Sequence, residues 1–297
     1  MPTPRITLVI PTYNRSASLL RALQSVAAQR LDPALWCCLI IDNNSTDDTA
    51  EVVARFAADH PTLSIRCVKE ERAGVSHARN RALREATTEL VCSIDDDERI
   101  NPDFVETYLR FFEAHPEAVV AGGRIVAEYE EGRPAWHSRW TDQLIANPID
   151  RGTTVHPFPE GKLPGGGNMG FRREAALEVG FATELGRVGG VLLGGEENDF
   201  FLRLREAGYP LWYLPEATIW HIIPPEKCTL DYLKRLARNN GISQSRRAAL
   251  RGTSRRMLRL KEALKWVATL LLCCTMHPRK GCALLLMRRE ISRGIYQ

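Results

Sequence analysis

Four consecutive acids, Asp95 to Glu98, are the residues of this 297-residue chain best suited to chemistry. They follow Leu90–Ile94, a short apolar segment bounded by charge, which predicts a strand buried inside a sheet. In open α/β sheets, ligands bind at the carboxyl ends of the strands, where these acids lie. Adjacent carboxylates repel one another by an energy on the order of 1 kcal/mol, which a bound cation removes. Such oxygen ligands suit Mg²⁺ or Mn²⁺, which usually arrive with phosphates. The alternative is a polar turn before the helix that Asn101-Pro102 opens.

Two other predicted strands also end in polar loops. Residues 5–10 lead into the loop Thr12–Arg15, and residues 37–41 lead into the loop Asp42–Asp47. Strands that alternate with helices of about 10–15 residues predict a parallel sheet with helices on both faces. The three polar loops would then line one edge of the sheet, so we expect a ligand site there. No GxGxxG follows the first strand and no GxxxxGK[ST] occurs, so phosphates must be held in another way.

Hydrophobic periodicity and turn residues give the remaining elements. Strands are expected at residues 5–10, 37–41, 63–68, 90–94, 119–127, 211–214 and 217–221. Helices are expected at residues 16–30, 48–59, 75–84, 102–115, 172–179, 194–207, 229–240 and 246–265. Residues 129–163, rich in Gly, Pro and Trp, are expected to form loops that face a substrate. Together the elements indicate an α/β protein with a helical C-terminal segment.

A second acidic cluster, Glu196, Glu197 and Asp199, stands at the start of a predicted amphipathic helix. Acids at a helix N-terminus interact favourably with the helix dipole, which explains some of them without any function. Three acids within four residues exceed what capping requires. One carboxylate there could therefore act as a general base.

Two further features allow more than one interpretation. The run Gly165–Gly167 before Asn168 permits close approach of the backbone to a ligand, but it equally forms a simple bulge. His221 ends a predicted strand, and a lone histidine in such a place is more often structural than a metal ligand.

Composition and cysteine usage indicate an intracellular folded protein. The chain is 44% apolar and 26% charged, which is ordinary for a folded domain. Its eight cysteines form no CxxC motif and no paired framework, which favours a reducing compartment. The N-terminus leads directly into a strand, without a segment that would serve as a signal peptide. We therefore expect a cytosolic chain.

The C-terminal part is strongly basic. Residues 234–297 carry 16 Lys or Arg and two acids, whereas residues 1–233 carry 24 basic and 34 acidic residues. Two uncharged runs, Trp266–Met276 and Gly281–Met287, are shorter than the ~20 residues that span a bilayer. Basic helices beside short apolar runs are typical of interfacial contact with anionic lipid, which we expect for residues 246–293. The alternative is a helical hairpin that packs on the rest of the chain with a solvated basic face. No nucleic-acid partner is expected, because no recognised motif accompanies the charge.

The order of the motifs resembles that of the family-2 inverting glycosyltransferases, and the resemblance spans about residues 5–245. The motifs that carry it are Pro11-Thr12-Tyr13-Asn14, Asp42-Asn43-Asn44-Ser45-Thr46-Asp47, Ala78-Arg79-Asn80, Asp95-Asp96-Asp97, Gly167-Asn168, Gly195-Glu196-Glu197-Asn198-Asp199 and His221. The resemblance implies the GT-A type nucleotide-diphospho-sugar transferase fold, with a mostly parallel central sheet and flanking helices. It further implies a catalytic domain at residues 1–228, with a nucleotide-binding half at 1–127 and an acceptor half at 128–228. The basic helical segment would then be residues 229–297.

On the donor side, the resemblance assigns Asp42 to the base or ribose of a nucleotide-sugar, with Pro11 and Tyr13 lining the same pocket. Asp95 is expected near the ribose, and Arg79 and Asp96 belong to the same donor site.

The resemblance also assigns the metal and acceptor sides. Asp97 would bind a Mg²⁺ or Mn²⁺ ion that bridges the diphosphate, and His221 matches a histidine that often completes the metal shell. Many relatives have an Asp as the base in a Glu-Asp pair, where this chain has Glu197, so Glu196 is kept as the second candidate. Asn168 and Asp199 are expected on the acceptor side.

The implied function is transfer of a sugar from a nucleotide-diphosphate sugar, with UDP the expected nucleotide, to an acceptor hydroxyl. A metal-assisted single displacement would invert the anomeric centre. Saccharide or lipid-linked acceptors are expected, in cell-surface polysaccharide or glycolipid synthesis at the inner face of the plasma membrane. Acceptor choice is expected in residues 129–163 and 187–193.

Two rivals remain at this point. A sugar nucleotidyltransferase would have a Gly-rich, basic first loop, and Pro11–Arg15 lacks the glycines. A non-catalytic binding protein on the same fold would not need all of the acidic positions.

Overall fold

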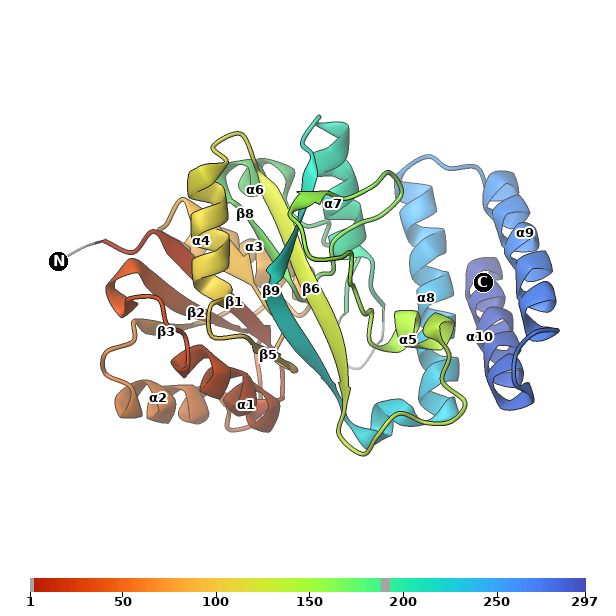
Figure 1. The fold of residues 1–297 in the computed structure, drawn as a ribbon, viewed down its shortest axis with the longest axis horizontal. Helices are drawn as coiled ribbons and strands as arrows, with labels where there is room; N and C mark the ends of the chain where they lie inside the picture. The colour runs from red at the N-terminus through yellow and green to blue at the C-terminus, as the bar shows by residue number, and fades with distance from the viewer. Residues whose placement is uncertain (1–2, 188–192) are drawn as a thin grey trace. The chain divides into compact units, whose positions relative to one another are not determined.

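A computed structural model describes residues 3–187 and 193–297 of the chain (Figure 1). The chain divides into two compact units. The first takes in the chain up to Val126, together with Ile149–Thr183 and Glu196–His221. The second takes in Ala127–Pro148, the described part of Glu184–Gly195, and Ile222–Gln297. The domain boundary expected at residue 228 stays a prediction.

The first unit is built around a mixed sheet. Its strands are β1 (Ile6–Thr12), β2 (Trp36–Asp42), β3 (Ile65–Lys69), β4 (Leu90–Ser93), β5 (Glu98–Ile100), β6 (Val120–Tyr129), β7 (His156–Pro157), β8 (Met169–Arg172) and β9 (Leu211–Ile223). The strand order is β3-β2-β1-β4-β8-β6-β9-β5, with β7 paired to β9. Strands β3, β2, β1 and β4 are parallel, and β8 continues the sheet in the antiparallel sense. The parallel arrangement predicted for the strands up to residue 94 is confirmed.

Helices flank the sheet and close its core. They are α1 (Ser16–Ala27), α2 (Thr49–Asp59), α3 (Val75–Glu85), α4 (Phe104–Ala114), α6 (Arg173–Val179) and α7 (Glu196–Glu206), with a 3-10 turn η1 (Pro33–Leu35). Helix α1 buries Leu19, Leu23 and Val26, as its periodicity predicts. Strand β1 is buried along its whole length. Each large apolar side chain buried in this way contributes about 1.5–3 kcal/mol to stability. The sheet edge that carries the polar loops is therefore held rigidly.

Two strand predictions need correction. Residues 211–221, expected as two short strands, belong to the single strand β9. Pro215 does not break it, because β7 pairs with Trp212 and Tyr213 and β5 pairs from Ile219 onward, so the proline falls between the two pairings. Strand β5 was not expected at all, since three residues after an acidic run give no periodicity.

The second unit is helical. Its elements are α5 (Arg139–Ile145), η2 (Pro225–Cys228), α8 (Leu230–Leu250), α9 (Arg255–Cys273) and α10 (Pro278–Tyr296), and the last three lie side by side (Figure 1). The prediction of helices at 229–240 and 246–265 was wrong in its boundary. Helix α8 continues to Leu250, and the chain turns at Gly252, whose φ is +65°. Ser254 then caps α9 by accepting a hydrogen bond from the Met257 amide at 3.2 Å.

The apolar run Gly281–Met287 is part of a core. Ala283, Leu284 and Met287 are buried in a cluster with side chains of α8. The backbones of the two helices touch where a Cβ on Gly294 would lie 2.0 Å from the Arg238 carbonyl oxygen. These three side chains are therefore not available to lipid. The expected contact of residues 246–293 with an anionic membrane stays a prediction. Among the described residues, none of the helices combines the length and the apolarity that crossing a bilayer requires.

Candidate active site

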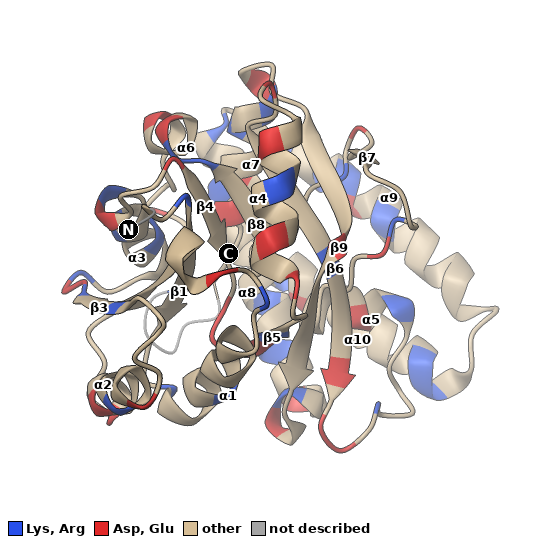
Figure 2. Cartoon of the chain, turned by 60° about the vertical axis from the view of Figure 1, so that its left-hand side comes forward, with Lys and Arg blue, Asp and Glu red and all other residues tan. Residues whose placement is uncertain are grey.

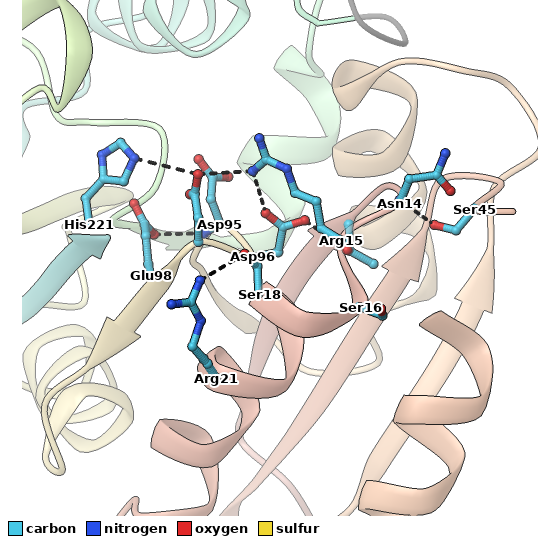
Figure 3. A network of polar contacts seen from close by, with 12 residues as sticks. Asn14, Arg15, Ser16, Ser18, Arg21, Ser45, Asp95, Asp96, Glu98 and His221 are labelled. Atoms are coloured by element: carbon cyan, nitrogen blue, oxygen red, sulfur yellow. Dashed lines mark hydrogen bonds and ion pairs between the residues drawn. The ribbon is translucent and has the colours of Figure 1, made fainter. Parts of the chain in front are cut away.

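The first two polar loops are fastened to each other. The Asn14 amide donates to Ser45 Oγ at 2.9 Å, and the Thr46 amide donates to Asn14 Oδ1 at 2.7 Å (Figure 3). Asn14 and Asn44 adopt left-handed backbone angles, with φ of 51° and 64°. Asparagine tolerates this conformation better than most residues. The convergence of the two loops predicted from the sequence is confirmed.

Asp42 ends β2 beside this junction. Its carboxylate is buried and accepts a hydrogen bond from the Ser45 amide at 2.9 Å. The next residue, Asn43, accepts from the Gly74 amide at 2.7 Å and so ties the start of α3 to the same loop. In the neighbouring strand β1, Pro11 is paired with Ile41 of β2. Tyr13 follows with a side chain that is 40% exposed, and its ring is therefore accessible to a flat ligand.

The aspartate run is held by Arg15, a residue that the sequence did not single out. Arg15 Nη1 lies 3.0 Å from Asp96 Oδ1 and 3.0 Å from Asp97 Oδ2. Thr12 Oγ1 also donates to Asp96 at 2.8 Å. Burial raises the pKa of Asp96 to about 6, against the attraction of Arg15. Asp96 therefore lies inside the fold and braces the loop.

Asp97 and His221 come together as predicted. Strand β5 pairs with β9 so that Glu98 is opposite His221, and His221 Nε2 lies 3.7 Å from Asp97 Oδ2. Figure 3 shows His221 and Arg15 approaching the aspartate run from opposite sides. A carboxylate oxygen and an imidazole nitrogen this close can share one divalent ion. In the parts of the chain that the structure describes, no three His, Cys, Asp or Glu residues form a metal-binding group. An ion at Asp97 and His221 would therefore need oxygens from a ligand.

Glu98 is a second residue that sequence reasoning missed. It is buried, and its Oε2 accepts a hydrogen bond from the Asp95 amide at 2.8 Å. Burial, with the nearby charges of Asp95 and Asp97, raises its pKa well above the ordinary value for a glutamate. A Cβ on Gly167 would lie 1.9 Å from Glu98 Oε1, so a larger residue there would displace the Glu98 carboxylate. The Gly-rich run thus makes room for Glu98, which in turn shapes the aspartate turn.

Arg79 connects the aspartate run with the second acidic cluster. From α3 its buried guanidinium donates to Asp95 Oδ1 at 3.1 Å and to Glu196 Oε1 at 2.7 Å. Its Nη2 also lies 3.4 Å from the Gly166 carbonyl oxygen. One side chain therefore joins three segments that are far apart in the sequence.

The two neighbouring glutamates of α7 lie in different surroundings. Glu196 is buried, and burial together with the charge of Glu197 raises its pKa to about 8. Glu197 is only partly buried, packs near Gly166, and accepts a hydrogen bond from Asn198 at 3.0 Å. A general base must come within hydrogen-bond reach of the proton that it removes. Of the two carboxylates, Glu197 is the less buried.

Asn168 and Asp199 make structural contacts. The Asn168 side chain accepts from Tyr108 Oη at 2.7 Å and donates to main-chain carbonyls of β6 and β9. Asp199 accepts from Arg203 Nε at 2.7 Å, one turn along α7. Their acceptor-side assignment stays a prediction, and the geometry supports a bracing role for both.

The regions assigned to acceptor choice are only partly described. Residues 188–192 of the expected segment 187–193 lie outside the described residues. The segment 129–163 holds α5 and a buried cluster in which Tyr129 Oη and His137 Nδ1 contact Asp142 Oδ1 at 2.7 and 2.8 Å. This cluster gives the expected loop region a fixed shape.

The sequence matches a described protein family. The model of glycosyl transferase family 2 matches residues 7–180, which contain every site element above except the acids of α7, segment 187–193 and His221. The chain is 28% identical over 233 residues to the glucosyl-dolichyl phosphate glucuronosyltransferase of Haloferax volcanii, covering 77% of this chain and 72% of that protein. It is 26% identical over 248 residues to the succinoglycan biosynthesis protein ExoM of Rhizobium meliloti, covering 82% and 75%.

Solved structures share the fold. The mannosyltransferase PcManGT of Pyrobaculum calidifontis, in complex with GDP-Man and Mn²⁺, matches 98% of this chain and 87% of its own with a TM-score of 0.62 at 19% identity. Residues 1–349 of S. aureus TarS, in complex with UDP, match 98% and 89% with a TM-score of 0.56 at 17% identity. These likenesses confirm the GT-A type α/β fold.

Proposed function

Because the chain belongs to glycosyl transferase family 2, we propose that it moves a sugar from a UDP-sugar to an acceptor hydroxyl with inversion at the anomeric carbon. The observation that carries this proposal is the Arg79 bridge. The Arg79 guanidinium donates both to Asp95, on the proposed donor side, and to Glu196, which precedes the candidate base Glu197. Donor and acceptor chemistry require such closeness, since reacting groups must be held in near-attack geometry.

The donor's nucleoside is proposed to lie at the edge formed by the first two loops. Asp42 ends β2 there with a carboxylate already fixed by the Ser45 amide. The accessible ring of Tyr13 offers a stacking surface. Asp95 is proposed to accept a hydrogen bond from a ribose hydroxyl. The nucleotide diphosphate would then extend toward Asp97.

The residues at Asp97 fit a divalent ion of the Mg²⁺ or Mn²⁺ type. Asp97 and His221 would hold it as two protein ligands, and phosphate oxygens would supply others, as is usual for Mg²⁺. Such an ion, when bound, stabilises the negative charge that grows on the departing diphosphate. Arg15, which now pairs with Asp97, adds a fixed positive charge in the same place.

Glu197 is proposed to act as the general base. An acceptor hydroxyl is a weak nucleophile until its proton is removed, and a carboxylate in reach can take that proton during attack. The acceptor oxygen forms a bond to the anomeric carbon as the bond to the diphosphate oxygen breaks. Attack from the opposite face inverts the centre, and no covalent enzyme intermediate forms. Glu196 is held by Arg79 and positions its neighbour.

Nucleotide binding tests the donor site. Calorimetry with UDP, with and without Mn²⁺, is expected to show metal-dependent binding by the wild-type protein that Asp97→Ala removes. Asp150→Ala, a change of an exposed carboxylate in the same unit, is the matched control and is expected to bind UDP normally. Metal-independent binding in the wild type, or unchanged binding by Asp97→Ala, would contradict the metal assignment. The same titration with GDP and dTDP tests the choice of nucleotide.

The acceptor and location are part of the proposal. The name of the Haloferax volcanii relative includes a dolichyl phosphate, which supports a lipid-linked saccharide as acceptor. The biosynthetic role in the name of the Rhizobium meliloti relative supports work on cell-surface polysaccharide or glycolipid. We place the protein at the inner face of the plasma membrane. Release of UDP with a new glycoside would separate this function from nucleotidyl transfer and from binding without turnover.

A further inference from the structure

Helix α9 is amphipathic, but its apolar side is exposed and its polar side is buried. Its outer side carries five apolar residues at spacings of three and four, and these are between 47% and 67% exposed: Met257, Leu260, Leu264, Val267 and Leu271. The opposite side carries Glu262 and Thr269, which are buried. A helix on the surface of a water-soluble protein normally shows the opposite arrangement. The outer side of α9 is therefore an apolar stripe that faces out.

The polar side of α9 is fixed to α10. Arg288 Nη1 lies 3.3 Å from both carboxylate oxygens of Glu262, and Ser292 Oγ donates to Glu262 at 2.8 Å. The indole of Trp266 donates to Ser292 at 2.8 Å. Turning the helix to bury its apolar stripe would break the ion pair and leave Arg288, whose side chain is only 14% exposed, without its carboxylate partner. The structure thus holds the stripe outward.

The charges beside the apolar stripe indicate which kind of partner it can contact. The exposed basic residues Arg256, Arg259 and Lys261 lie on the same helix, and the one acid of α9, Glu262, is buried. Figure 2 marks Lys and Arg positions on α9 in blue. Spacings of three and four would also suit a second copy of the helix in a coiled coil. Two copies would, however, bring arginines and lysines together with no exposed acid on either helix, which is unfavourable. Anionic lipid offers both an apolar layer and the opposite charge.

We propose that the stripe of α9 lies at the headgroup and acyl boundary of an anionic membrane, with Arg256 and Lys261 against lipid phosphates. The proposal names the contact surface for the membrane location proposed above and rests on it, but not on the donor chemistry. It assigns the contact to α9 alone, since the apolar run of α10 is buried against α8. Such binding scales with the apolar area inserted and with attraction to anionic lipid.

Vesicle flotation of the full chain tests the proposal. The wild-type protein is expected to float with vesicles of phosphatidylcholine and phosphatidylglycerol, and less with phosphatidylcholine alone or at high salt. The double variant Leu264→Asp with Leu271→Asp is expected to lower the partition coefficient by about tenfold or more. Arg256→Gln with Lys261→Gln is expected to weaken binding to the anionic vesicles only. Leu177→Asp, an exchange of a leucine of α6 that is 37% exposed, is the matched control and should bind as the wild type does.

Two results would overturn the lipid contact. Undiminished flotation of the Leu264→Asp, Leu271→Asp protein is the first. The second is a dimer of the wild-type chain in light scattering without vesicles that this variant dissociates, because the stripe would then be covered by a second copy. Circular dichroism and UDP calorimetry on every variant show whether it is folded. A protein that binds vesicles but no nucleotide would contradict the donor site and leave the α9 contact standing.

Discussion

The loss of Arg79 would disturb more of the candidate site than the loss of any other of its residues. Arg79 pairs with Glu196, 117 residues along the chain, and with Asp95. Its guanidinium contacts both carboxylates at once, which a lysine ammonium cannot do in the same geometry. Removing the charge altogether would leave Glu196 buried without its cationic partner and favour the protonated carboxyl group still further. In the proposed mechanism, Arg79 is a positioning residue for Asp95 and Glu196.

Arg79→Lys is expected to lower kcat by about tenfold to a hundredfold, because small displacements of reacting groups are costly. KM for the donor should change little, and Arg79→Met should be worse than the lysine variant. Arg81→Lys on the same helix, at a partly exposed ion pair with Glu85, is the control and should keep its activity. Steady-state kinetics with a UDP-sugar measure the difference. A folded Arg79→Lys enzyme with the kcat of the wild type would show that the bridge is dispensable.

Glu197→Gln is expected to lower kcat by about 10²–10⁴-fold, the range for loss of a general base. UDP affinity should stay at the wild-type value, because the carboxylate is assigned to the acceptor side of the reaction. Glu196→Gln is the comparison that decides between the neighbours. If Glu196→Gln loses more turnover than Glu197→Gln in a folded protein, the base assignment moves to Glu196.

At the level of elements, the sequence predicted what local patterns determine. Strands β1, β2 and β4 are apolar runs that end in polar loops, so their shared edge could be expected. Strand β5 could not be expected, because its three residues become a strand only through pairing with β9. That pairing is what carries His221 to Asp97. The likeness of motifs predicted the meeting, and long-range pairing explains it.

Substitution of glycines in α10 tests how closely α8 and α10 pack. Gly294→Ala is expected to lower the free energy of unfolding by about 1–3 kcal/mol, since its Cβ would meet the Arg238 carbonyl oxygen at 2.0 Å. Gly281→Ala on the same helix, where a Cβ would meet Cys273 at an ordinary 3.7 Å, is expected to have no effect or to stabilise by up to about 1 kcal/mol. Urea unfolding followed by circular dichroism measures both. Equal stability of the two variants would argue against the close approach.

At the scale of the whole molecule, the sequence predicted where charged residues gather better than it predicted which side chains are exposed. The sequence shows that residues 234–297 are basic and hold two apolar runs. It does not show that the run Gly281–Met287 packs in a core while the apolar stripe of α9, which extends into the run Trp266–Met276, is exposed. The two runs have a similar composition. Likewise, four acids in a row predicted a site, but not that Asp96 and Glu98 would be buried braces while Asp97 meets His221. Burial depends on segments that meet only after folding, and local pattern does not contain it.

The hydrogen bonds around Asn14 have a consequence for the thermodynamics of donor binding. Fixing one backbone residue costs about 1–2 kcal/mol of conformational entropy. The bonds of Asn14 to Ser45 and Thr46 mean that folding has already met this cost for the two loops at the proposed nucleotide site. A preorganised surface spends little of the contact energy on ordering itself. The two loops should therefore contribute little unfavourable entropy when a nucleotide binds.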